Sequence, residues 1–79
     1  MERDVVLVVA PDAGLSHSLA FALESGGFDV AMHRRASEAF RSRDAGNAAC
    51  AVVDDDAIED WTLARQQFAA FARPVIVLA

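Results

Sequence analysis

Three consecutive aspartates, Asp54, Asp55 and Asp56, are the side chains of this sequence best suited to chemistry. They come directly after Cys50–Val53, an apolar run that reads as a buried strand. Carboxylates this close together repel one another, which favours a bound cation or partial protonation. The competing interpretation is a solvated acidic loop that leads toward the N-terminus of a helix, where negative charge is stabilising. The run therefore predicts either a cation site or an acidic helix entry.

A fourth carboxylate, Asp12, follows the other strongly apolar run, Val5–Ala10, after Pro11. Asp12 is a suitable N-cap for the helix that we expect next, and a rotated side chain could also reach a cation at the strand ends. The loop APDAG has one glycine where a dinucleotide fingerprint needs three, and Asp12 would repel a pyrophosphate. We therefore expect no phosphate-cradling loop here.

The remaining reactive side chains favour no catalytic centre. Cys50 is the only cysteine, so no internal disulfide forms, and we expect a small buried hydrophobe. His17 and His33 have no metal ligand at helical spacing and are expected at the surface. No nucleophile–base pair is visible, so the sequence predicts no enzyme.

The composition limits the classes of function. The 79 residues allow one domain at most, and 54% of them are hydrophobic. A net charge of −5 argues against direct binding of nucleic acid, which depends on neutralising phosphates. No run is long enough to span a membrane. We expect a cytoplasmic domain whose excess apolar surface meets a protein partner.

The elements that must position these residues alternate between strand and helix. Apolar or alternating runs predict four strands, and apolar stripes at helical spacing predict three helices between them. Such alternation implies right-handed crossovers and a parallel sheet with helices on both faces. The predicted strands are residues 5–10, 28–32, 49–53 and 75–78, and the predicted helices are residues 13–25, 33–43 and 60–72.

Helical spacing also predicts which residues of these helices face the core and which face the solvent. Leu15, Leu19 and Leu23 form an inward stripe on the first helix, and Trp61, Phe68 and Phe71 form one on the third. Residues 44–47, "DAGN", predict a turn after the second helix. The arginines of that helix and its approach form a solvated face or a surface for an acidic partner; they are Arg34, Arg35, Arg41 and Arg43.

The segments "VVLVV", "LSHSLAFALESGGFDV", "CAVVD" and "ARPVIVL", in this order, resemble the receiver domain of bacterial response regulators. The amino-acid sequence of these segments is most similar to that of receivers of the nitrogen-fixation regulator type. The resemblance implies a three-layer flavodoxin-like fold with strand order 2-1-3-4. The family's last helix, strand and helix are not among these residues. Residues 1–79 are thus expected to be a single receiver-like domain or the N-terminal part of a longer one.

The resemblance also implies where the family's chemistry would fall. Receivers hold magnesium with an acidic pair after the first strand and a phosphoacceptor aspartate after the third. Here the pair falls on Ala10 and Pro11, and the phosphoacceptor position falls on Asp54. The family's hydroxyl position falls on Ala79, its lysine position lies beyond residue 79, and the chain has no lysine. We expect no metal or cofactor, unless Asp54 and Asp12 form a residual magnesium site beside Asp55 and Asp56.

Taken together, these features predict a receiver-like regulatory domain in bacterial signal transduction or transcription control. It would act by protein–protein association without magnesium-dependent phosphorylation, and its uncovered apolar surface would be covered in a homodimer or by a segment outside residues 1–79. Three alternatives stay open: a conventional receiver phosphorylated on Asp54, an α/β domain that binds a nucleotide or small ligand, and a small enzyme, which the lack of a visible nucleophile–base pair disfavours.

Overall fold

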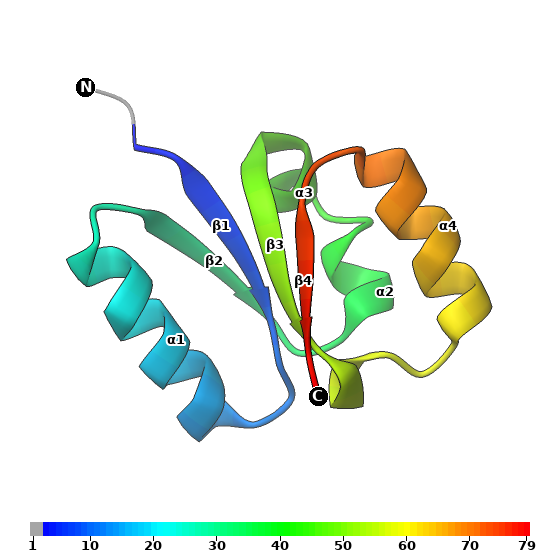
Figure 1. Ribbon diagram of the computed structural model, residues 1–79, viewed down its shortest axis with the longest axis horizontal. Helices are drawn as coiled ribbons and strands as arrows, with labels where there is room; N and C mark the ends of the chain where they lie inside the picture. Colours follow the sequence, from blue (N-terminus) through cyan, green and yellow to red (C-terminus); the bar gives the residue numbers. More distant parts are fainter. Residues whose placement is uncertain (1–2) are drawn as a thin grey trace.

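The computed structural model describes residues 3–79, which form a four-stranded, all-parallel sheet in the order β2–β1–β3–β4 (Figure 1). This is an α/β, flavodoxin-like fold, and it confirms the predicted fold class and strand order. The strands are β1 (Val5–Val9), β2 (Asp29–His33), β3 (Ala48–Asp54) and β4 (Val75–Leu78). The helices are α1 (Ala13–Ser25), α2 (Ala36–Ala39), α3 (Arg43–Asn47), the 3₁₀ turn η1 (Asp55–Ala57) and α4 (Trp61–Phe71).

β1 lies between β2 and β3, and its side chains are buried on both faces of the sheet. Leu7 and Val9 point into the larger core, which lies between the sheet and the helices α2, α3 and α4. Phe40 and Phe71 meet edge-to-face there, with ring centroids 5.3 Å apart. A continuous β-branched run thus forms the central strand because both of its faces exclude water.

The opposite face of the sheet is covered over only half of its width. α1 contacts β1 and β2, and Figure 1 shows it on one side of the sheet with α2, α3 and α4 on the other. The strand register continues that face across Cys50 and Val52 of β3 to Ile76 and Leu78 of β4. Ile76 is 55% exposed, and the other three are half-buried. We call these four residues the open face.

Residues at the helix ends show how α1 begins and how α1 and α4 end. Asp12 accepts a hydrogen bond from the backbone N–H of Gly14 at 3.0 Å, so its predicted capping role is confirmed. Gly27, with φ of 94°, takes the left-handed conformation after α1. Ala72 takes the same conformation at the end of α4, with φ of 56°, although it carries a Cβ. The two helices therefore end in similar backbone but with different residue types.

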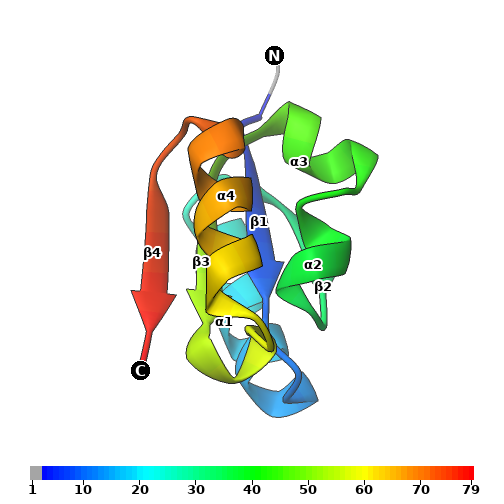
Figure 2. The ribbon, with the colours of Figure 1, turned by 90° about the vertical axis from the view of Figure 1, so that its right-hand side faces the viewer.

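The prediction of one helix over residues 33–43 followed by a turn is wrong. The structure has two short helices, α2 and α3, separated around Ser42 (Figure 2). The hydroxyl of Ser42 donates to the carbonyl of Ala39, and its backbone N–H donates to the same oxygen. These local bonds close α2, and Ser42 then stands as the N-cap position of α3, so the predicted turn at 44–47 is helical.

Three expectations about burial also need correction. Trp61 is 45% exposed, because α4 buries its inward row at Ala64 and Phe71 while Trp61 lies on its first turn. The predicted leucine stripe of α1 is only half-buried, and Ser16 and Ala20 are the residues that α1 buries. Cys50 is half-buried, since it belongs to the open face.

Among the described residues, no helix has the length and hydrophobicity that a membrane span requires.

Candidate site at the carboxyl ends of the strands

The sheet brings Ala10 and Asp54 to neighbouring positions. Val9 pairs with Val53 across β1 and β3, so the next residue of each chain segment emerges at the same edge of the sheet. The expected strand order is thus confirmed, with Ala10 directly after β1 and Asp54 as the last residue of the adjacent parallel strand β3. Ligands of open α/β sheets bind outside this edge, so the arrangement defines the place where chemistry is to be sought.

The three aspartates form a compact group at this edge. One carboxylate oxygen from each of Asp54, Asp55 and Asp56 lies within 4.8 Å of the others. Asp54 ends β3, and its Oδ1 accepts a hydrogen bond from the backbone N–H of Asp56 at 3.2 Å. Asp54 therefore caps the 3₁₀ turn η1, and this turn folds the next two carboxylates back toward it. The capping bond is a structural role that exists without any cation.

The pKa of Asp55 is shifted within this group of carboxylates. Loss of hydration, a side-chain hydrogen bond with Asp54 and repulsion by the charges of Asp56 and Asp54 together raise the pKa of Asp55 above its ordinary value. A backbone hydrogen bond from Asp56 opposes this shift. The direction agrees with partial protonation, one of the two consequences expected from crowded carboxylates.

The position of Asp12 separates it from this group. Its carboxylate caps α1 through Gly14, and the set of oxygens within 4.8 Å holds Asp54, Asp55 and Asp56 without Asp12. Three of the four residues of the predicted acidic cluster therefore lie together, and Asp12 is not part of this group. A residual cation site that combines Asp54 with Asp12 would require Asp12 to leave its cap.

The residues beside the aspartates on β1 offer no ligand side chain. Ala10 is 2% exposed, and its backbone N–H donates to the carbonyl of His33 at 3.0 Å. Pro11 is half-buried and has neither an N–H nor an oxygen on its side chain. Magnesium and calcium take about six or more oxygen ligands, and the side chains of Ala10 and Pro11 add none to the group of Asp54, Asp55 and Asp56. Ala79, which follows β4, adds only a methyl group.

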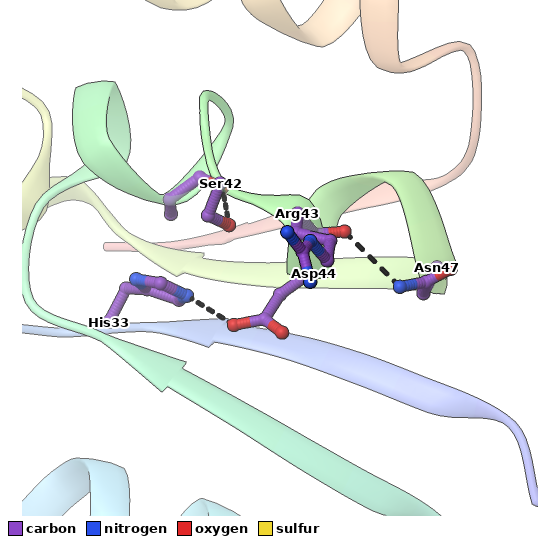
Figure 3. A network of polar contacts seen from close by, with 6 residues as sticks. His33, Ser42, Arg43, Asp44 and Asn47 are labelled. Carbon is purple, nitrogen blue, oxygen red and sulfur yellow. Dashed lines mark hydrogen bonds and ion pairs between the residues drawn. The ribbon is translucent and has the colours of Figure 1, made fainter.

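One polar contact near this edge was not predicted from the sequence. His33 Nε2 and Asp44 Oδ2 lie 2.8 Å apart, and Figure 3 shows the imidazole of β2 facing the carboxylate of α3. The His33 side chain is 22% exposed, so the expectation of a plain surface histidine is wrong. The two residues are eleven positions apart and lie on different elements, β2 and α3, so no local periodicity of the sequence predicts their contact.

Comparison with known proteins gives one informative likeness. The chain is similar to a bacterial regulator. The transcriptional regulator protein FixT of Rhizobium meliloti is 35% identical over 68 residues, which cover 86% of this chain and 57% of the relative. This chain thus spans little more than half the length of the relative that it matches. No family model matches the chain, and no solved structure matches it.

Proposed function

We propose that residues 1–79 are a receiver-like regulatory domain of bacterial signal transduction or transcription control, working in the cytoplasm without enzymatic activity. The likeness to a protein named as a transcriptional regulator supports a regulatory role. The strand order 2-1-3-4, with Asp54 at the end of β3, supports the receiver-like assignment. The domain would act through protein contacts, without binding nucleic acid or a membrane directly.

The observation that supports the mechanism is that Ala10 and Pro11 follow β1 directly beside the end of β3, where Asp54 lies. A phosphoryl donor and an acceptor carboxylate repel each other, so transfer needs positive charge between them. Ala10 and Pro11, which follow β1, supply no side-chain ligand for a cation at this point. We therefore propose that Asp54 is not phosphorylated in a magnesium-dependent reaction.

Intact mass after incubation with acetyl phosphate and magnesium is the test, with Asp54→Asn as the matched control. The proposal predicts no phosphate adduct on either protein. An adduct on the wild type that disappears in Asp54→Asn would establish the second candidate function, a conventional receiver. The grouping of Asp54, Asp55 and Asp56 within 4.8 Å is the observation that favours this candidate.

The open face supports the association part of the proposal. The open face is an uncharged, apolar strip formed by residues of β3 and of β4, which is the edge strand of the sheet. Edge strands that remain free in solution are usually protected by charge, bulges or proline, and β4 carries no charge. We propose a second copy of this chain as the partner, because an identical uncharged edge can pair with β4 in a two-fold arrangement.

The molar mass in solution, measured by light scattering across a range of concentrations, tests this. The wild type should show a dimer, and Ile76→Asp should weaken dimerisation by at least about tenfold, since it buries a charge at the contact. Gln66→Asp, on the exposed side of α4, adds the same charge elsewhere and should leave the dimer intact. A monomer at every concentration of the wild type would refute the homodimer.

A further inference from the structure

A crevice of about 580 Å³ lies beside the aspartates at the carboxyl edge of the sheet, with residues that follow three different strands along its walls. Its volume falls within the roughly 300–1,000 Å³ of small-molecule sites. It opens next to the junction of β1 and β3, where the strand order reverses and where α/β folds of this kind bind ligands. Its lining includes Pro11, Arg34, Arg35, Glu38, Asp56 and Glu59.

Charges of opposite sign come from two different connections of the chain. Arg34 and Arg35 belong to the segment between β2 and α2, whereas Asp56 and Glu59 belong to the segment between β3 and α4. Arg35 Nη1 lies 3.5 Å from Glu59 Oε1, so the two segments approach each other across the crevice. The crevice thus has its two arginines on one side and Asp56 and Glu59 on the other, and Glu38 of α2 adds a third carboxylate to its lining.

The side chains are available to a ligand. The pair of Arg35 and Glu59 is well exposed, at 60% and 70%, and exposed ion pairs contribute little to stability. Breaking it costs correspondingly little. Arg34 is exposed and makes no ion pair with any residue in 3–79. A guanidinium in this state can receive a carboxylate through two parallel hydrogen bonds.

We propose that this crevice binds a small zwitterion of about dipeptide size, a use of the strand ends separate from any phosphorylation. The carboxylate of the ligand would bind Arg34 and Arg35, and its ammonium group would face Asp56 and Glu59. A simple anion would meet the repulsion of these acids, and a simple cation that of the arginines. Only a ligand with both charges matches both sides.

The ligand site differs from the aspartate group. Asp54 and Asp55 do not line the crevice, and Asp56 is the one member that the two share. The inference does not depend on the receiver-like assignment or on the homodimer. The phosphorylation and molar-mass experiments can therefore fail while zwitterion binding succeeds, and the reverse also holds.

Diglycine is a suitable probe, with acetate and ethylamine as probes that each carry one of its two charges. In ¹⁵N-resolved NMR titrations at constant ionic strength, diglycine should cause saturable shifts of the amides of Arg34, Arg35, Asp56 and Glu59. Acetate and ethylamine should bind at least about fivefold more weakly, because each leaves one side of the crevice unmatched. Equal binding of acetate and diglycine would overturn the zwitterion proposal in favour of a plain anion site.

Two arginine variants locate the site. Arg34→Glu should weaken diglycine binding by at least about fivefold, because it reverses a charge at the carboxylate end. Arg41→Glu makes the same charge change at an exposed position outside this crevice and should leave binding unchanged. Equal weakening in both variants would show an effect of net charge alone. Absence of saturable shifts with the wild type would overturn the proposal outright.

Discussion

Val9 and Val53 pair across β1 and β3, and this pairing makes Ala10 and Asp54 neighbours at the carboxyl edge of the sheet. The group of Asp54, Asp55 and Asp56 is thus placed beside Ala10 and Pro11. Neither Ala10 nor Pro11 offers a side-chain ligand. Three carboxylates are grouped at this strand end, whereas Ala10 and Pro11 add no side-chain oxygen to them. That imbalance suggests how to restore metal binding.

A carboxylate introduced by Pro11→Asp should raise magnesium affinity at least about tenfold, since affinity for hard cations follows the number of charged oxygen ligands. Shifts of the Asp54–Asp56 amides during a magnesium titration would report this. Ala13→Asp adds the same charge on the first turn of α1 and serves as the control. Equal magnesium affinity in all three proteins would contradict the role given to position 11.

The contact between His33 and Asp44 should stabilise the packing of α3 against β2. Replacing His33 with Ala should lower the free energy of unfolding by about 0.5–1 kcal/mol, a modest loss because Asp44 is half exposed to solvent. Urea denaturation measures this change. In a double-mutant cycle with Asp44→Asn, the two losses should be less than additive. Fully additive losses would mean that the two side chains do not interact.

Asp55 should make the domain less stable as the pH rises. Its pKa is raised in the folded state, so the folded protein holds the proton at pH values where the unfolded chain has released it. This contribution is present at acidic pH and is lost as the pH rises through the raised pKa. Asp55→Asn should therefore be more stable than the wild type at pH 7, and the difference should shrink toward pH 3.

Urea unfolding of both proteins at several pH values gives this difference directly. Glu24→Gln, an exposed change on α1, controls for the loss of one negative charge. The same gain at pH 7 in Glu24→Gln would assign the effect to net charge and not to the crowding of Asp55 by its neighbours.

Replacing Ala72 with glycine should stabilise the folded protein. It occupies the left-handed region with φ of 56°, where a Cβ is unfavourable by about 1 kcal/mol. Ala72→Gly should raise the melting temperature, whereas Ala69→Gly, inside the same helix, should lower stability by about 1 kcal/mol. Destabilisation by both substitutions would show that the C-terminal end of α4 gains more from the Ala72 methyl group than its conformation costs.

Much of this molecule follows from local patterns. The apolar runs of β1 and β3 predicted buried parallel strands, and β1 is covered on both faces, whereas Cys50 and Val52 of β3 are only half-buried. The alternation of strands and helices predicted the sheet, and the parallel sheet then placed Ala10 and Asp54 at one edge. Asp12 was predicted as a helix cap from its type and position, and its bond to Gly14 confirms this.

The tertiary structure decided what depends on distant neighbours. Helical periodicity identifies the apolar side of α1 and α4 but cannot say how far that side is covered, so Trp61 and the leucines of α1 are more exposed than expected. The division into α2 and α3, the contact of His33 with Asp44 and the open face have the same origin. A side chain's own sequence sets its preference for water or core, whereas its final surroundings come from segments brought together by folding.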